Sequence, residues 1–289
     1  MFTKSTSIDI CGKLHRGAVE LYRAVDEATS QLNIPYLIVG AMARDIVLVH
    51  GFGAAIERGT RDVDFGIQVA SWADFEKLES SLIDRGFVSS REPQRLISPE
   101  EWELEIAYID LVPFGDLSDA AAQITWPPDG EVKMSVLGFA EALENAIQVK
   151  LDANPDLVVP VVSPPGMALL KLVAWGERDI GLRPKDAQDL LYLMNTYLKI
   201  EDAVNEAYES GAMDEFDHEF GPVGAYLLSL HSKQIAGQAT ADRIAEILCD
   251  TKLYEALLLD MSRGRDVDLV AAQLAAFKQG FVTVDEVQE

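Results

Sequence analysis

The stretch that decides the fold is Tyr36-Leu37-Ile38-Val39-Gly40-Ala41, with Asp62-Val63-Asp64 beginning 22 residues after Gly40. Four consecutive apolar residues are typical of a buried strand. The glycine that follows permits a tight turn into a helix, which the pattern predicts over residues 42–49. Alternation from Asp62 to Val69 predicts a second strand with one apolar face. This order of elements indicates an α/β core.

Two acids on the second predicted strand point to metal chemistry. Asp62 and Asp64 are two residues apart, so their carboxylates project from the same face, about 7 Å apart along the strand. Such carboxylates repel each other unless a cation lies between them, and hard oxygen ligands suit Mg²⁺. The alternative is a solvated strand end.

A third acid belongs to a later strand. Residues 102–112 alternate, which places Asp110 on a face with Leu104, Ile106, Tyr108 and Val112. An acid on an apolar face is costly unless it is paired or ligates a metal. Asp110 is therefore a candidate third ligand, with a paired core acid as the alternative.

A second copy of the same tripeptide shows that Asp-x-Asp alone is uninformative. With 25 Asp in 289 residues, about two such pairs are expected by chance, and two occur. Asp266-Val267-Asp268 precedes an alanine-rich helical pattern, where acids complement the helix dipole. We interpret this copy as a helix cap, so that context distinguishes Asp62 and Asp64.

Composition excludes several classes of protein. The formal net charge is −24, which disfavours a general nucleic-acid coat or binding to an anionic membrane. Cys11 and Cys249 lack ligand spacing, which disfavours a disulfide framework or a structural zinc site and suits a reducing cytoplasm. We expect no signal peptide, no membrane span and a cytoplasmic location.

The chain divides by pattern into a mixed and a helical part. Residues 8–32 and the segment from Ser71 to Arg85 are expected to be helices, and 157–162 an edge strand because of Pro160. Pro164-Pro165 then opens a helix, and further helices are predicted over 185–198, 200–210, 240–260 and 266–279. We expect an α/β core with a mixed sheet over 1–163, including an N-terminal helix, and a mostly helical domain over 164–289.

These residues resemble the nucleotidyltransferase superfamily of DNA polymerase beta type. Its pattern is a Gly-Gly or Gly-Ser turn after the first strand, Asp-x-Asp on the second, and a third Asp on a later strand. Gly40-Ala41, Asp62/Asp64 and Asp110 match it, with alanine in place of the family's glycine or serine. The run from Val39 to Asp45 is also similar to the opening of the tRNA CCA-adding enzymes.

The second half narrows the resemblance to the AbiEii/MenT group, known as the toxin halves of type IV toxin–antitoxin pairs. That group has a lysine on the helix after the last core strand and a Lys-Asp-x-x-Asp-Leu segment on the next helix. Lys171 matches the lysine, and Lys185-Asp186-Ala187-Gln188-Asp189-Leu190 matches the segment. The similarity covers roughly residues 35–195.

The resemblance implies a two-ion, Mg²⁺-dependent transfer of a nucleoside monophosphate from a nucleoside triphosphate such as ATP to an acceptor hydroxyl. It implies that Asp62, Asp64 and Asp110 are the catalytic and metal-binding residues. The nucleotide-binding candidates are Gly40, Ala41, Lys171, Arg178, Asp186 and Asp189. The acceptor would be RNA or protein, with a cognate antitoxin as partner.

Several alternatives compete with this reading. The acidic chain would also suit an adenylyltransferase acting on cationic small molecules such as aminoglycosides, or an inactive homologue that only binds a nucleotide or a partner. Lys171 could be a surface lysine, and Gly40-Ala41 a plain strand–helix turn. Asp186 and Asp189 could be packing acids paired with Lys185 or Arg183.

Overall fold

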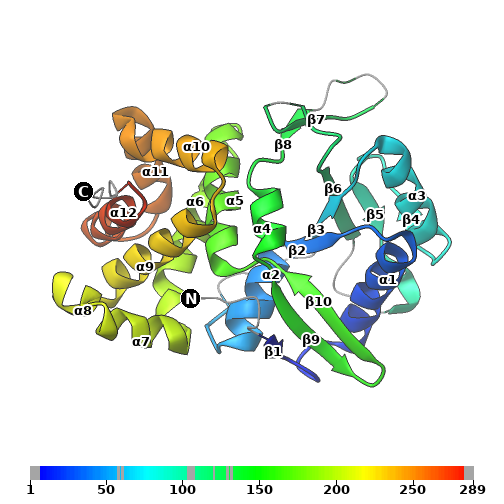
Figure 1. Ribbon diagram of the computed structural model, residues 1–289, viewed down its shortest axis with the longest axis horizontal. Coiled ribbons are helices and arrows are strands. Elements are labelled where there is room, and N and C mark those ends of the chain that lie inside the picture. The colour runs from blue at the N-terminus through cyan, green and yellow to red at the C-terminus, as the bar shows by residue number, and fades with distance from the viewer. Residues whose placement is uncertain are drawn as a thin grey trace, which may run out of the picture. The chain divides into compact units, whose positions relative to one another are not determined.

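A computed structural model of the protein describes residues 7–56, 59, 62–102, 108–119, 121–127, 130 and 133–282. The chain divides between Ser163 and Pro164 into two compact units, and each is described by itself (Figure 1). Among the described residues, no helix is both long enough and apolar enough to cross a bilayer.

The first unit contains an eight-stranded mixed sheet in the order β1-β9-β10-β2-β3-β6-β5-β4, as the expected α/β core requires. Its strands are β1 (Ser7–Asp9), β2 (Tyr36–Val39), β3 (Asp62–Gln68), β4 (Val88–Ser89), β5 (Arg95–Ile97), β6 (Tyr108–Phe114), β9 (Ile147–Ala153) and β10 (Asp156–Val161). A separate hairpin joins β7 (Gln123–Thr125) to β8 (Lys133–Ser135).

The central strands of the sheet are largely buried. Every residue of β2 is buried, and β2 runs antiparallel to β3, which in turn runs parallel to β6. Of the predicted strand 102–112, residues 103–107 lie outside the described part of the chain and 108–112 belong to β6. Trp102 is not in a strand, because it ends the 3₁₀ turn η2 (Glu100–Trp102). Parallel pairing of β3 and β6 places the amino ends of both strands at the same edge of the sheet.

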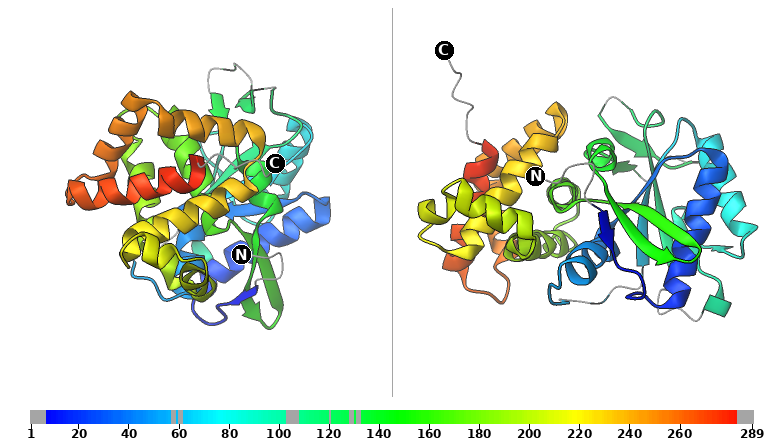
Figure 2. Two further views of the ribbon diagram at one scale, coloured as in Figure 1. Left: turned by 60° about the vertical axis from the view of Figure 1, so that its left-hand side comes forward. Right: turned by 60° about the horizontal axis from the view of Figure 1, so that its bottom comes forward.

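Helices cover both faces of this sheet. On one face, Tyr22 of α1 (Arg16–Leu32) packs edge-on against Phe65 of β3, and α1 lies beside α3 (Trp72–Ile83) (Figure 2). On the other, Phe139 of α4 (Phe139–Glu144) packs against Phe114 of β6. The predicted cap of α3 is confirmed, because Ser71 accepts a hydrogen bond from the Asp74 amide.

The expected helix over 8–32 begins later than predicted. Residues Ser7–Asp9 form an outer strand parallel to β9, and Gly12 adopts a left-handed conformation with φ of +74°. The side chain of His15 then caps α1 by accepting from the Gly17 amide. The apolar spacing alone did not reveal this turn. Ile8 is buried in β1, and an apolar residue would be buried in the same way on the inner face of a helix.

The helix expected over 42–49 begins earlier and changes type. α2 (Gly40–Arg44) starts at the glycine itself, and η1 (Asp45–Gly51) continues it as a π-helix. Phe52, whose amide donates to the Val47 carbonyl, follows the last turn.

The expectation that 157–162 forms an edge strand is wrong, because β10 lies between β9 and β2. Pairing of β10 with β2 begins only at Val161, and the Val162 amide donates to the Ile38 carbonyl. Amide directions alternate along a strand, so the missing N–H of Pro160 falls on the β2 side just before that ladder starts. An interior proline therefore removes no ladder hydrogen bond here.

The second unit is helical. Its helices are α5 (Pro164–Glu177), α6 (Pro184–Thr196), the 3₁₀ turn η3 (Tyr197–Lys199), α7 (Glu201–Glu209), α8 (Ala212–Glu215), α9 (Phe220–Ile235), α10 (Gln238–Cys249), α11 (Thr251–Met261) and α12 (Val267–Val282). The predicted single helix over 240–260 is interrupted at Asp250, whose carboxylate caps α11 by accepting from the Leu253 amide.

Candidate active site

Three acids converge at one edge of the central strands. Asp64 of β3 and Asp110 of β6 are direct partners in the parallel register, and Asp62 lies two residues before Asp64 on the same face. Each of the three offers a carboxylate oxygen, and these oxygens lie within 4.8 Å of one another. All three side chains are partly exposed. Asp110 therefore faces Asp62 and Asp64, as a third metal ligand would.

The glycine of the predicted turn lies directly against one of these acids. Gly40 has a φ of +73°, and a Cβ at this position would lie 2.8 Å from Asp64 Cγ and closer still to a carboxylate oxygen. Val39 is the register partner of Asp64, which explains why the start of α2 meets this side chain. Only glycine combines this backbone conformation with the space that Asp64 occupies.

Arg95 is a site residue that sequence reasoning missed. Its Nε donates to Asp110 Oδ1 and its Nη2 to Asp110 Oδ2, both at 2.8 Å. The two residues are cross-strand partners of β5 and β6, and the guanidinium lies 3.8 Å from the centre of the Tyr108 ring. Hydrogen bonding to Asp110 raises the pKa of Arg95, which keeps the cation in place. This fork fixes the orientation of the third acid.

A second ion pair lies on the helix that follows Gly40. The buried Arg44 donates from Nε and Nη2 to one oxygen of Asp45, at 2.9 and 2.8 Å. Burial raises the pKa of the Tyr22 hydroxyl, and the Asp45 and Asp64 carboxylates raise it further. Tyr22, a buried neighbour of Asp45 and Asp64, therefore keeps its hydroxyl proton.

The donor set fits a hard divalent cation. It consists of three carboxylates with converging oxygens and partial solvent access, and it contains neither thiolate nor imidazole. Mg²⁺ and Mn²⁺ prefer such oxygen ligands. The second Asp-Val-Asp behaves as predicted for a cap, because Asp266 accepts from the Asp268 amide at 2.9 Å at the start of α12.

Residues proposed for nucleotide binding in the helical unit form one ion-pair cluster. Lys171 Nζ lies 3.1 Å from an Asp186 oxygen and 2.7 Å from an Asp189 oxygen. Arg178 contacts the other Asp186 oxygen at 2.7 Å. Both acids are buried. Their observed partners are thus Lys171 and Arg178, whereas the packing alternative had named Lys185 and Arg183.

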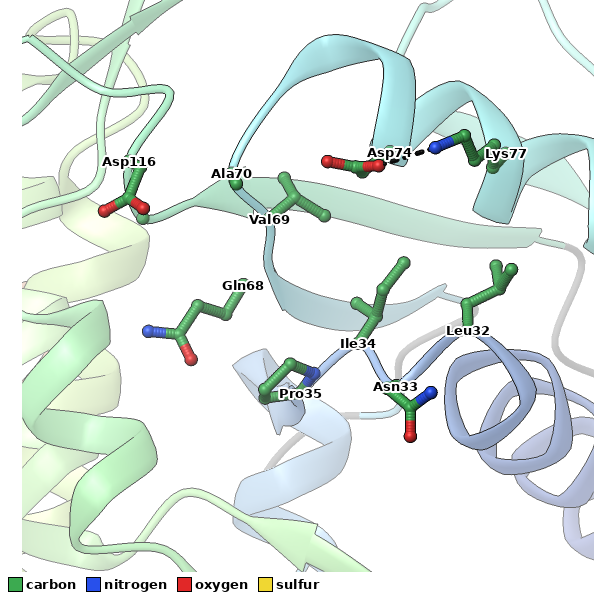
Figure 3. Close-up of a pocket in the computed structure, with 11 residues that line it drawn as sticks. Leu32, Asn33, Ile34, Pro35, Gln68, Val69, Ala70, Asp74, Lys77 and Asp116 are labelled. Atoms are coloured by element: carbon green, nitrogen blue, oxygen red, sulfur yellow. Dashed lines mark hydrogen bonds and ion pairs between the residues drawn. The ribbon is translucent and has the colours of Figure 1, made fainter.

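A cavity of about 500 Å³ lies elsewhere in the first unit (Figure 3). It is lined by Gln68 at the carboxyl end of β3, Asp116 just after β6 and Asp74 in the first turn of α3, and by the end of α1. Gln68 is four residues beyond Asp64, which is about 13 Å along a strand. None of the predicted site residues lines this cavity.

A mixed sheet that presents a glycine turn and three converging carboxylates defines the class of nucleotidyltransferases. The comparison with family models agrees. Residues 23–283 match the model described as nucleotidyl transferase AbiEii toxin of type IV toxin–antitoxin systems, and the chain therefore belongs to this family. No curated protein matches the sequence.

Proposed function

We propose that the protein transfers a nucleoside monophosphate from a nucleoside triphosphate to an acceptor hydroxyl, with Mg²⁺ held by Asp62, Asp64 and Asp110. The observation that carries the proposal is the convergence of these carboxylates beside Gly40. The acceptor oxygen would form a bond to the α-phosphorus while the bond to the bridging oxygen breaks, releasing pyrophosphate. The acceptor proton would pass to Asp110 and then to solvent.

Bound divalent cations would supply charge stabilisation for the attacking and leaving oxygens. The residues of the chain supply the geometry. Asp62 and Asp64 would hold the cations from β3, and Asp110 would do so from β6. The lack of a side chain at Gly40 makes room for the Asp64 carboxylate. The small Ala41 that follows would leave backbone N–H groups at the start of α2 free to contact the triphosphate.

Arg95 acts through Asp110 in this proposal. By donating to both carboxylate oxygens, it holds Asp110 in one rotamer and leaves the second lone pairs of these oxygens for a cation or a proton. The oxygens of Asp110 therefore need no reorientation before the reaction.

In the helical unit, we assign Lys171 and Arg178 to the phosphate groups of the nucleotide. Asp186 and Asp189 position them, since Asp186 contacts both cations and Asp189 contacts Lys171. Burial of the two acids makes their carboxylates fixed anchors for long basic side chains.

We further propose RNA or protein as the acceptor, a cognate antitoxin as the partner in the cell, and a cytoplasmic location. Membership of the type IV toxin family supports the first two. A net charge of −24 instead favours a cationic small-molecule acceptor, so that this class belongs in the same test.

The test is transfer of label from an NTP carrying ³²P at the α-position, in the presence of Mg²⁺. Total tRNA, a protein extract and a set of aminoglycosides are offered as separate acceptors. We expect labelling of tRNA or protein by the wild type and no labelling by Asp64→Ala. The circular dichroism spectrum of Asp64→Ala should be the same as that of the wild type. Asp268→Ala, in the second Asp-Val-Asp, is the matched control and should retain full transfer.

Full transfer by Asp64→Ala would show that the metal assignment is wrong. Labelling confined to aminoglycosides would replace the RNA or protein acceptor by the small-molecule alternative. Lack of transfer to every acceptor, together with retained nucleotide binding, would favour the inactive homologue.

A further inference from the structure

Apart from the ion-pair cluster around Lys171, the helical unit carries a surface that combines anchored arginines with exposed aliphatic side chains. We call it the Asp260 surface and define it as Ile180, Leu182, Arg183 and Arg263. It lies where the loop between α5 and α6 meets the end of α11. Asp260, which is 2% exposed, joins the two segments.

The buried carboxylate of Asp260 orients both arginines. Arg183 Nε donates to Asp260 Oδ2 at 2.8 Å, and Arg263 Nη2 donates to Oδ1 at 2.9 Å. The Arg183 guanidinium also lies 4.8 Å from the Trp175 ring centre, and Trp175 Nε1 donates to the same carboxylate. Each guanidinium has five N–H donors, so one bond to Asp260 leaves further donors for a partner.

The aliphatic residues of this surface are held on a closed turn. The carbonyl of Asp179 accepts from the Leu182 amide at 2.9 Å and from the Arg183 amide at 3.2 Å. Ile180 is 71% exposed and Leu182 is 59% exposed, which leaves much of both side chains in water. Two neighbouring aliphatic residues on a fixed turn lose little conformational entropy when a partner covers them.

We propose that the Asp260 surface binds a segment of another protein that carries both acidic and aliphatic side chains. Preoriented arginines form charge-assisted hydrogen bonds with carboxylates, often in pairs. Arginine is also enriched among the residues that dominate protein–protein binding energy. Ile180 and Leu182 would bury apolar area against the aliphatic part of the same segment.

The composition of the surface favours protein over RNA as its occupant. Single-stranded RNA is bound through phosphate contacts and through bases that stack on exposed aromatic rings. Trp175, the aromatic residue nearest the arginines by the contacts above, is only 1% exposed. A chain with net charge −24 also repels a long polyanion more than a short segment with a few acids.

The experiment selects ligands for the full-length protein from a displayed library of random 16-residue peptides. The strongest peptide is then labelled, and its affinity is measured by fluorescence anisotropy. We expect selected sequences to be enriched in Asp or Glu and in Leu or Ile. The double variant Ile180→Ser/Leu182→Ser and the single variant Arg263→Glu should each weaken binding about tenfold or more.

Matched controls come from the other unit. Val88→Ser/Ile97→Ser removes an exposed aliphatic pair, and Arg16→Glu reverses an exposed charge at the start of α1. Both should bind the peptide as the wild type does. None of these variants touches the proposed catalytic or nucleotide-binding residues, so nucleotidyl transfer can be followed separately.

Any of four results would overturn the inference. The selected peptides could lack acidic residues, or bind all variants equally. Poly-U RNA could bind the wild type and lose affinity with Arg263→Glu but not with the serine pair, which would identify an RNA surface. Sedimentation velocity could show a dimer that Ile180→Ser/Leu182→Ser dissociates, which would identify a second copy of the chain as the occupant.

Discussion

Arg95 and Asp110 form a two-bond fork across the neighbouring strands β5 and β6, with both hydrogen bonds at 2.8 Å. The fork neutralises one of three clustered carboxylates and fixes its orientation. Asp62, Asp64 and Asp110 bring three carboxylates together, and such charges repel one another. Arg95 thus stabilises Asp110 in the metal-free site and also holds its carboxylate in the orientation proposed for metal binding.

Replacing Arg95 by lysine tests this link. Lysine keeps the charge but not the planar fork, so Asp110 gains rotational freedom. We expect transfer activity to fall about 100-fold, because misplacing a reacting group by about 1 Å has an effect of that size. The measurement is the initial rate of label transfer as a function of Mg²⁺ concentration, with the half-maximal concentration shifted upward.

Circular dichroism and thermal unfolding of Arg95→Lys serve as the folding control. A purely structural role would lower the melting temperature and leave the Mg²⁺ dependence of the remaining activity unchanged. That result would remove Arg95 from the site.

Sequence patterns identified the acids and the glycine as site residues but did not identify Arg95, and the reason is physical. Asp62 and Asp64 belong to a strand long enough to show a pattern, and Gly40 directly follows the apolar strand β2. In contrast, β5 has three residues and no visible alternation. A three-residue strand is defined by its partner β6, and the pairing of Arg95 with Asp110 is a long-range contact. Local periodicity carries no information about such a contact.

The same lack of long-range information in local patterns explains why some predicted elements differ from the structure. Pro160 indicates an edge strand, yet its missing N–H points toward β2 just before the β10–β2 ladder begins, so that no ladder hydrogen bond is lost. Apolar spacing continued through Gly12, although the backbone turns there and His15 begins the helix. Patterns identified which residues are buried, whereas tertiary pairing decided in which element some of them lie.

Gly40→Ala tests the close approach of the glycine turn to Asp64. An added Cβ overlaps the Asp64 carboxylate, and an alanine at a φ of +73° is strained as well. We expect a loss of about 1–3 kcal/mol in the free energy of unfolding and strongly reduced transfer. Urea denaturation and the labelled-NTP assay measure the two effects.

Gly53→Ala separates the two causes. Gly53 has a φ of +70°, but a Cβ there meets nothing within 4 Å. It should therefore show the backbone strain alone, with transfer activity retained. If both variants lose activity equally, the contact between residue 40 and Asp64 is not what matters.

Divalent cations should stabilise the protein through the three acids. Binding to the folded state raises the free energy of unfolding by about 2.7 kcal/mol when the metal is at 100 times its Kd. We expect Mn²⁺ or Mg²⁺ to raise the melting temperature relative to EDTA, and Asp62→Asn to abolish this increase. The melting temperature of Asp62→Asn in EDTA gives the effect of the substitution itself, so the metal response is the difference between the two conditions.

Asp266→Asn is the control for this measurement, since it alters the second Asp-Val-Asp and keeps a good capping residue. Its melting temperature should respond to metal as the wild type does. An equal loss of the metal response in both variants would show that the cation acts on general surface charge.

The ion-pair cluster of the helical unit predicts a loss of stability at alkaline pH. Burial by itself lowers the pKa of Lys171, but the Asp189 and Asp186 carboxylates outweigh it, so that the folded-state pKa is raised. A raised pKa contributes stability that is fully present below the unfolded value of about 10.4 and is lost as the pH rises through the folded value.

Lys171→Met removes the ammonium that faces both buried acids, and we expect it to lower the free energy of unfolding by about 3 kcal/mol at pH 7. Urea denaturation from pH 8 to 11.5 should then show a gap between wild type and Lys171→Met that narrows above about pH 10.4. Lys185→Met alters an exposed lysine on α6, the helix that carries Asp186 and Asp189, and should follow the wild-type curve. A gap that stays constant across this range would contradict the assignment.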